Sequence, residues 1–164
     1  TGKAKYKDVE EECWQAIEQG EELRKLLTEA IELDAKSFEG IIIARRLPRD
    51  TEENIRLRDK AIMEASFTAA AVPLHSAEMC LQVMKLALRM AQIGNLNAIS
   101  DAASGVYQAR AGLEAACLNV AINLMGYETE TRASELDRQA RELKLKSDEI
   151  VVELQTLLKD RSGL

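Results

Sequence analysis

Hydrophobic residues recur at intervals of three and four along most of the chain, a spacing that places side chains on one face of an α-helix. The first such pattern runs from about residue 7 to residue 46 and predicts one unusually long amphipathic helix. It ends before Pro48, because the residue preceding a proline avoids the α-helical region. Asp50, with Glu53 three residues later, predicts an N-cap and capping box for the next helix.

Three more helices follow. The second runs from about residue 51 to 93 and contains Pro73, which removes a backbone donor, so we expect a kink or break near residues 71 and 72. The third, about 101 to 124, is nearly all small or apolar, which is typical of a central or interface helix, and Gly126 ends it. The fourth, about 130 to 160, is strongly charged. Short connections predict an all-α, antiparallel up-and-down bundle, kinked near Pro73.

Composition favours a single helical domain over residues 1–164. The chain is 46% hydrophobic and 30% charged with only 2 Pro and 8 Gly, which argues against disorder. The net charge of −6, without a basic stripe on any predicted helix, disfavours nucleic acid as a partner. No apolar run approaches the roughly 20 residues that cross a bilayer, and no signal peptide is visible, so we expect a cytoplasmic protein without a membrane partner.

Cysteine and histidine usage narrows the possible chemistry. Cys13, Cys80 and Cys117 lie in helical apolar patterns without metal-ligand spacing and are interpreted as core residues of a reducing compartment. His75 is the only histidine, which disfavours a His-cluster metal site and a Ser-His-Asp hydrolase. Acid–base work would therefore fall chiefly on carboxylates, Lys or Tyr.

A polar segment from Gly94 to Asp101 separates the second and third helices. Gly94 fits the left-handed residue that closes a helix, and Ser100 or Asp101 fits the N-cap of the next. The segment also holds Asn95 and Asn97, which a surface corner rarely needs. It is therefore either a well-capped corner or part of a pocket.

Two other places combine polar groups with apolar helix faces. Asp34 borders the apolar stripe near Ile31 and Phe38, where a carboxylate is costly without partners, so it is either functional or a solvated boundary residue. Asn119 and Asn123 lie one helical turn apart on the apolar third helix. Their amides must find hydrogen-bond partners, either in a structural network or in the wall of a pocket.

Two basic clusters stand out in this acidic chain. The first cluster, near the start of the chain, consists of Lys3, Lys5 and Lys7. The second, at the connection between the first two predicted helices, consists of Arg45, Arg46 and Arg49. They are either ordinary solvated charge or a binding place for an anionic substrate tail.

Six blocks, in this order and spacing, resemble the formiminotetrahydrofolate cyclodeaminase / methenyltetrahydrofolate cyclohydrolase family of folate enzymes. Each block alone is modest, but together they are quite specific, and they cover roughly residues 1 to 124. The blocks are Thr1–Tyr6, Asp34–Phe38, Leu47–Glu53, Ala71–Leu74, Gly94–Asp101 and Asn119–Leu124.

The resemblance implies a homodimeric helical bundle that takes a tetrahydrofolate derivative as substrate and needs no cofactor or metal. Members release ammonia from the 5-formimino compound or open and close the 5,10-methenyl bridge with water. The family's key aspartate falls on Asp34, the expected acid–base group. The expected substrate-binding residues are Lys3, Lys5, Arg46, Asn95, Asn97, Ser100, Asp101, Asn119 and Asn123.

The family also has a glycine-rich segment upstream of the block that matches Thr1. We expect the 164 residues to lack this part of the family's pocket and to leave apolar surface on the third helix uncovered. Both activities use the same carbon, so the sequence does not choose between them. Two other interpretations stay open: a non-catalytic helical-bundle interaction protein, and an inactive relative that binds folate.

Overall fold

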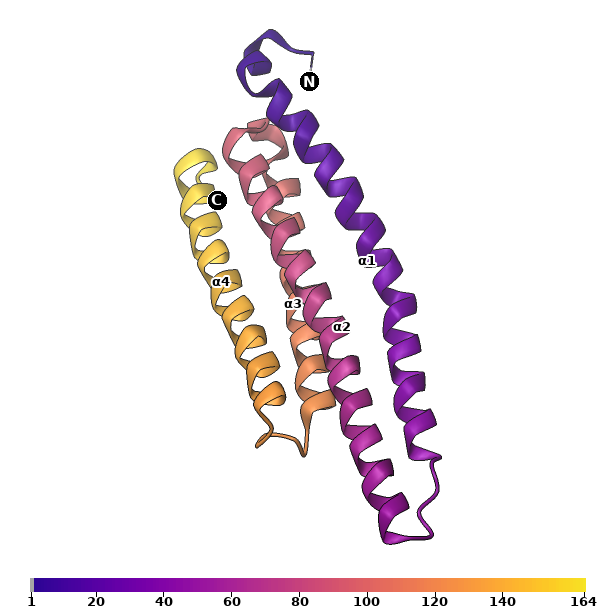
Figure 1. Ribbon diagram of the computed structural model, residues 1–164. Helices are drawn as coiled ribbons and strands as arrows, with labels where there is room; N and C mark the ends of the chain where they lie inside the picture. The colour runs from indigo at the N-terminus through magenta and orange to yellow at the C-terminus, as the bar shows by residue number, and fades with distance from the viewer. Residues whose placement is uncertain (1) are drawn as a thin grey trace.

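A computed structural model describes residues 2–164 of the chain (Figure 1). The described part is an all-α bundle in which each long helix runs antiparallel to the one before it, as the sequence predicts. The elements are η1 (Ala4–Val9), α1 (Glu10–Arg45), α2 (Glu52–Ile93), η2 (Leu96–Ala98), α3 (Ile99–Leu124) and α4 (Thr131–Ser162), where η marks a 3₁₀ helix.

Helix α2 is the centre of the bundle. It packs against α1, α3 and α4, and α3 also packs against α4, whereas α1 packs almost entirely against α2. Figure 1 shows α1 along one edge, with the α1–α2 hairpin extending beyond the ends of α3 and α4. Most of the circumference of α1 therefore faces outward.

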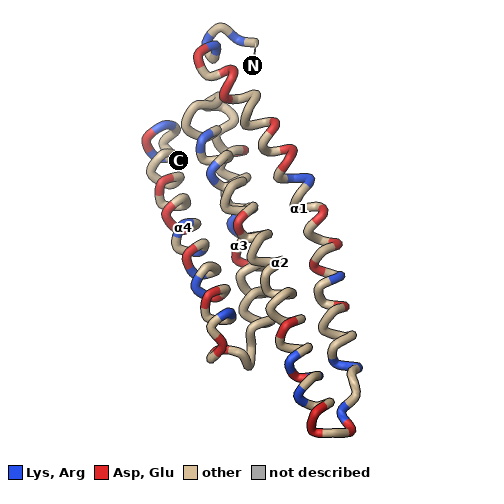
Figure 2. The backbone as a smooth tube through the Cα atoms, viewed as in Figure 1, with Lys and Arg blue, Asp and Glu red and all other residues tan. Residues whose placement is uncertain are grey.

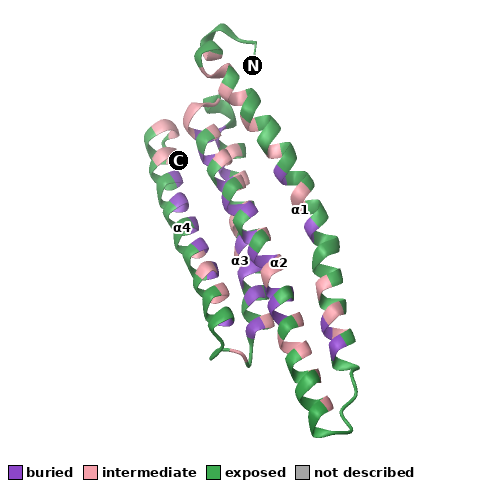
Figure 3. Cartoon of the chain, in the orientation of Figure 1, coloured by how far each residue is buried: buried purple, intermediate pink, exposed green. Residues whose placement is uncertain are grey.

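Two hydrophobic clusters hold these helices together. The larger joins α2, α3 and α4 around the fully buried side chains of Met84, Leu113 and Leu154 (Figure 3). Each such side chain contributes about 1.5–3 kcal/mol when it is fully buried. The smaller cluster contains Leu23, Ala30 and Met79 and joins α1 to α2. Helix α1 is thus the most lightly held of the four long helices.

Several apolar residues of α1 that the periodicity places on its packed face are exposed. Ile31 is 72% exposed and Phe38 57%, and Ile17 and Leu33 are also exposed. The prediction of a single packed stripe is wrong at these positions, because α1 faces one neighbouring helix and buries only a narrow strip. Its buried residues are Leu23, Ala30, Ile41 and Ala44.

Helix α2 continues without interruption across Pro73, so a break at residues 71 and 72 does not occur. Proline has no N–H, and the carbonyl of Ala69, four residues earlier, therefore lacks its usual helical donor. The side-chain amide of Asn123 on α3 donates to this carbonyl at 3.1 Å. A neighbouring helix thus supplies the hydrogen bond that the proline removes.

The start of α2 differs by one residue from the sequence prediction. Thr51 is the N-cap, and its Oγ1 accepts the backbone N–H of Asn54 at 3.1 Å. Asp50 instead accepts the side-chain amide of Asn54, which lowers the pKa of Asp50. A capping box between Asp50 and Glu53 is therefore not formed, because threonine takes the capping position.

The predicted capping around the α2–α3 turn is also wrong in detail. Gly94 has φ −74° and ψ −174°, an extended rather than left-handed conformation. A Cβ there would lie 2.5 Å from the carbonyl oxygen of Met90, so the position needs glycine for space. The N-cap of α3 is Ala98, without a side-chain cap, and Asp101 lies in the first helical turn. Gly126, with φ +87°, follows the end of α3 as predicted.

Two of the three cysteines are core residues, as the sequence predicts. Cys80 and Cys117 are buried, and burial raises the pKa of both thiols. Cys13 is only half-buried and lies outside both hydrophobic clusters, so its interpretation as a core residue is wrong. His75 lies on the surface, with its Nδ1 3.1 Å from the carboxylate of Glu78. Within residues 2–164, no helix combines the length and apolarity that crossing a membrane requires.

Candidate functional site

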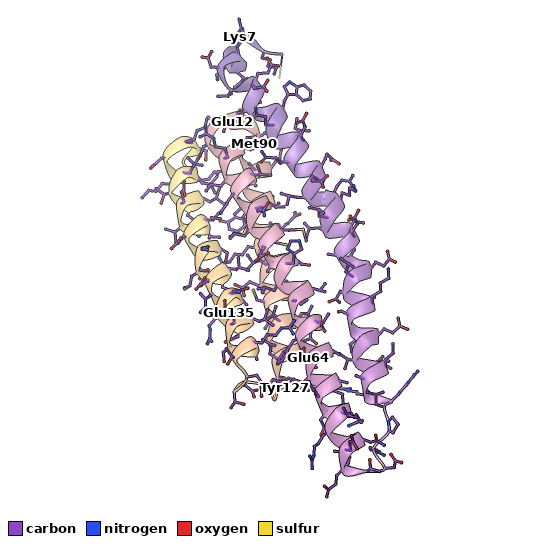
Figure 4. The ribbon with its side chains drawn as sticks, viewed as in Figure 1. Lys7, Glu12, Glu64, Met90, Tyr127 and Glu135 are labelled. Atoms are coloured by element: carbon purple, nitrogen blue, oxygen red, sulfur yellow. The ribbon has the colours of Figure 1, made fainter. Side chains whose placement is uncertain are left out.

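One end of the bundle brings together two polar segments that are far apart in the sequence. The hydroxyl of Tyr6, in η1, donates to Oδ1 of Asn95 in the α2–α3 turn at 3.2 Å. The backbone N–H of Asn97 donates to the same oxygen at 3.2 Å. Figure 4 shows Lys7, Glu12 and Met90 near this end of the bundle. The lysine cluster and the asparagine turn therefore form one surface.

Two arginines hold this end in place. The Arg89 guanidinium donates to both carboxylate oxygens of Glu12, with Nε–Oε1 at 2.5 Å and Nη2–Oε2 at 3.0 Å. This hydrogen bonding lowers the pKa of Glu12 and raises that of Arg89. Arg161, near the end of α4, donates to the carbonyl of Ala91. The turn after α2 is thus anchored from both α1 and α4.

The lysines at this end are exposed. Lys5 Nζ lies 5.5 Å from the centroid of the Tyr6 ring, within the range of a cation–π interaction. The carbonyl of Lys3 accepts the backbone N–H of Tyr6 at 2.9 Å. Among residues 2–164, neither Lys3 nor Lys5 forms an ion pair. The structure therefore groups six predicted site residues here: Lys3, Lys5, Asn95, Asn97, Ser100 and Asp101.

Asp34 lies elsewhere, on the exposed surface of α1. The register of α1 on α2 is set by the Glu12–Arg89 pair at one end and by the hydrogen bond from Arg58 Nε to the Arg45 carbonyl at the other. Interpolation between these contacts places Asp34 level with Ala69 of α2. Its neighbours one turn away, Ile31 and Phe38, are exposed too. Asp34 is therefore an open carboxylate between uncovered apolar side chains.

The two asparagines of α3 lie at the same level of the bundle as Asp34, because Asn123 binds the carbonyl of Ala69. Asn119 is exposed one turn before it. Asn123 thus has the structural partner that the sequence left as one alternative, with its Nδ2 engaged. The side-chain amide of Asn119 faces the protein surface.

These two groups are well separated along α1. Glu12 marks the lysine–asparagine end, and the 22 residues from Glu12 to Asp34 span about 33 Å at 1.5 Å per residue. Arg46 lies at the far end of α1, away from Lys3 and Lys5. Figure 2 shows basic residues, coloured blue on the backbone, at both ends of this helix. Within one chain, the two basic clusters therefore do not form a single anion site.

Two features of this end are not evident from the sequence. Tyr6 lies in the first family-like block, between Lys5 and Lys7, but only the folded chain shows its contact with Asn95. The Glu12–Arg89 pair joins residues 77 positions apart, and neither residue interrupts its helical pattern. No local signal reports such contacts. Within residues 2–164, no cluster of three or more His, Cys, Asp or Glu side chains could hold a metal ion.

Comparison with known proteins identifies the family. A family model described as formiminotransferase-cyclodeaminase matches residues 1–142. A methenyltetrahydrofolate cyclohydrolase of Methylorubrum extorquens is 42% identical over 134 residues, which are 82% of this chain and 64% of that protein. A rat formimidoyltransferase-cyclodeaminase is 36% identical over 98 residues, 60% of this chain and 18% of that protein.

The fold has a close counterpart among solved structures. Formiminotetrahydrofolate cyclodeaminase from Thermotoga maritima matches with a TM-score of 0.83 at 23% identity, over 97% of this chain and 75% of that one. The protein is thus an all-helical bundle of the cyclodeaminase type. The chain belongs to the formiminotransferase-cyclodeaminase family. It spans less than two thirds of the length of the curated relatives that it matches.

Proposed function

We propose that this chain acts in folate one-carbon chemistry, on 5-formiminotetrahydrofolate or 5,10-methenyltetrahydrofolate. The observation that carries the proposal is the family match over residues 1–142, together with relatives named for these two activities. The exposed carboxylate of Asp34 lies within this matched region and supplies a group for acid–base catalysis. A cytoplasmic location remains part of the same prediction.

Asp34 is the proposed acid–base residue. A methenyl-bridged folate carries a delocalised cation, and a nearby carboxylate stabilises that charge. In cyclodeamination, N10 attacks the formimino carbon and loses its proton. The bond from that carbon to the imino nitrogen then breaks, and Asp34 in its acid form gives a proton to the departing amine, which leaves as ammonia. In cyclohydrolysis, the Asp34 carboxylate instead accepts a proton from the water that attacks the methenyl carbon, and it returns this proton to the bridge nitrogen whose C–N bond breaks.

The remaining polar residues are proposed to bind the substrate. Asn119 lies on α3, which does not pack against α1, and presents an exposed amide that suits the donor and acceptor edge of a pterin. Lys3 and Lys5 lie beyond Glu12, which is itself about 33 Å from Asp34 along α1, and would bind the anionic glutamate tail rather than the reacting ring. The end of the bundle that would bind the glutamate tail also holds Asn95, Asn97, Ser100 and Asp101. In one chain, Arg46 is too distant to share that role.

We also propose that the protein forms a homodimer through α1. Trp14, Ile17, Ile31 and Phe38 are all at least half exposed on this helix. Helix α1 opens with three glutamates and closes with Arg45 and Arg46. Within α1 itself, an antiparallel second copy would place the three glutamates of one helix beside Arg45 and Arg46 of the other, whereas a parallel copy would oppose like charges. The lysines of η1 precede this helix and are not part of that pairing.

Calorimetric titration of the purified chain tests the proposal against a non-catalytic bundle. A folate enzyme binds 5,10-methenyltetrahydrofolate, whereas an interaction protein gives no heat with any folate. Ammonia release from the formimino substrate and loss of methenyl absorbance then separate the two activities. Binding without either reaction would identify an inactive folate-binding relative, and absence of binding would contradict the proposed function.

A further inference from the structure

The orientation of the Asn95 side chain is fixed by its neighbours. The backbone N–H of Asn97 can only donate, so the atom it meets at 3.2 Å must be the carbonyl oxygen of the Asn95 amide. The Tyr6 hydroxyl donates to the same oxygen at 3.2 Å. Both contacts occupy Oδ1, and Nδ2 makes no hydrogen bond within residues 2–164. The two N–H groups of Asn95 therefore remain available to an acceptor outside the protein.

The ring of Tyr6 orders a second donor. Lys5 Nζ lies 5.5 Å from the ring centroid, so the aromatic face and the hydroxyl of one side chain hold an ammonium and an amide. Two nearby carboxylates are engaged: Glu10 accepts the Gly2 N–H at 2.5 Å, and Glu12 is paired with Arg89. The carboxylates of Asp8 and Asp101 are exposed at the same end, and neither pairs with Lys5 or Asn95 within residues 2–164. The ammonium of Lys5 and the NH₂ group of Asn95 thus have no internal acceptor.

We infer that Tyr6 is a positioning residue that presents Lys5 and Asn95 to the carboxylates of the substrate's glutamate tail. The inference rests on the proposed function and specifies how the glutamate tail of the substrate is bound. An ammonium and a carboxamide NH₂ supply only donors, and a carboxylate supplies only acceptors. Tyr6 itself need not touch the substrate, because it acts by holding the two donors from different segments of the chain.

Two substitutions at Tyr6 separate its hydroxyl from its ring. Tyr6→Phe keeps the ring beneath Lys5 but removes the hydrogen bond to Asn95, whereas Tyr6→Leu removes both. With a triglutamyl methenyl substrate, we expect Tyr6→Phe to raise KM about five-fold, the effect of one neutral hydrogen bond, with kcat unchanged. Tyr6→Leu should raise KM further. With a pteroate substrate that lacks glutamate, neither substitution should change KM.

Two controls test whether the effect runs through Asn95. Once Tyr6→Phe has released the amide, adding Asn95→Ala should cost much less than Asn95→Ala does alone. Tyr107→Phe on α3 removes an exposed tyrosine hydroxyl that takes no part in the Tyr6–Asn95 contact, and it should leave KM unchanged. Melting temperatures of all variants are measured alongside, so that loss of folding is recognised directly.

The outcomes distinguish this inference from the proposed function. If wild-type protein binds and turns over the triglutamyl substrate but Tyr6→Phe leaves KM unchanged, the inference is wrong and the function stands. An equal rise in KM for the tail-less substrate would also overturn it, since that is the result of a general structural role. Failure of wild-type protein to bind either substrate overturns the proposed function and this inference together.

Discussion

Asn123 on α3 donates its side-chain amide to the carbonyl of Ala69, the backbone group that Pro73 leaves without a helical donor. A proline inside a helix usually costs about 3 kcal/mol, through the lost hydrogen bond and the clash of its ring. Here a side chain from another helix restores the bond, and α2 continues through the proline. The asparagine and the proline, 50 positions apart, therefore form one structural unit.

This relationship predicts a non-additive effect on stability. Asn123→Ala leaves the buried Ala69 carbonyl unsatisfied and should lower the free energy of unfolding by about 1–2 kcal/mol. In a Pro73→Ala background, the restored N–H serves that carbonyl, and the same substitution should cost clearly less. Urea denaturation of the four proteins measures the coupling, and Asn119→Ala is the exposed control. Equal costs in both backgrounds would show that the two residues act independently.

Gly94 is expected to tolerate no side chain. Gly94→Ala places a Cβ 2.5 Å from the Met90 carbonyl oxygen, so the turn must shift, at a cost of about 1–3 kcal/mol. The matched control is Gly20→Ala in α1, where nothing lies within 4 Å of the added Cβ. That substitution should stabilise the helix by about 1 kcal/mol. Thermal unfolding measures the stability of both variants. If Gly94→Ala were as stable as wild type, the close approach to the Met90 carbonyl would be contradicted.

The Glu12–Arg89 pair predicts a pH dependence at the Tyr6 end. Hydrogen bonding to Arg89 holds the pKa of Glu12 below its ordinary value of 4.5. A lowered carboxyl pKa means that the contribution to stability is present above pH 4.5 and is lost as the pH falls through the lowered value. NMR titration should find a depressed Glu12 pKa in wild-type protein and a nearly ordinary one in Arg89→Gln. The same pKa in both proteins would contradict the pairing.

The exposed stripe on α1 predicts the oligomeric state. Ile31→Asp changes a side chain that is 72% exposed in the single chain, so it should fold normally but reduce the mass in solution from two chains to one. Leu145→Asp on α4 alters a side chain of similar exposure, 63%, and should leave the dimer intact. Light scattering after gel filtration measures both. A monomeric wild type, or a dimeric Ile31→Asp variant, would contradict an α1 interface.

The charge pattern offers a second test of the same interface. Glu11→Arg or Arg46→Glu alone should weaken an antiparallel dimer, because each opposes like charges across the α1 pair. The double variant restores opposite charges and should recover the dimer. Sedimentation at low salt is the measurement, since exposed charge pairs are screened at high salt. Equal weakening by the single and double variants would exclude the antiparallel arrangement.

Helix periodicity predicted the bundle because each long helix buries at least one stripe against α2. It failed for Ile31 and Phe38, since periodicity marks an apolar face without showing whether anything covers it. Capping was misplaced by one residue at Asp50, where Thr51 competes for the same role. Position 94 requires glycine because the Met90 carbonyl leaves no space for a side chain, and not because the backbone is left-handed. The presence of a glycine in the sequence does not distinguish these two reasons.

The candidate site was predictable in parts but not as a whole. Asn95 and Asp34 stood out because small polar groups in apolar surroundings need partners. Their separation along α1 follows from the helix length and register, which single positions do not reveal. Tyr6 was missed because its partner lies 89 residues away, and the role of Asn123 at Pro73 depends on how α3 is aligned with α2.

Turnover of Asp34→Asn shows whether Asp34 is the acid–base group of a folate one-carbon enzyme, as we propose. The amide keeps the size of the side chain but neither carries a charge nor transfers a proton. Glu39→Gln, on the exposed surface of the same helix, is the matched control. Both variants are assayed with 5-formimino- and 5,10-methenyltetrahydrofolate, by ammonia release and by loss of methenyl absorbance. We expect a fall in kcat of about a hundred-fold or more for Asp34→Asn and no change for Glu39→Gln. Turnover of Asp34→Asn within a few-fold of wild type would contradict this role of Asp34.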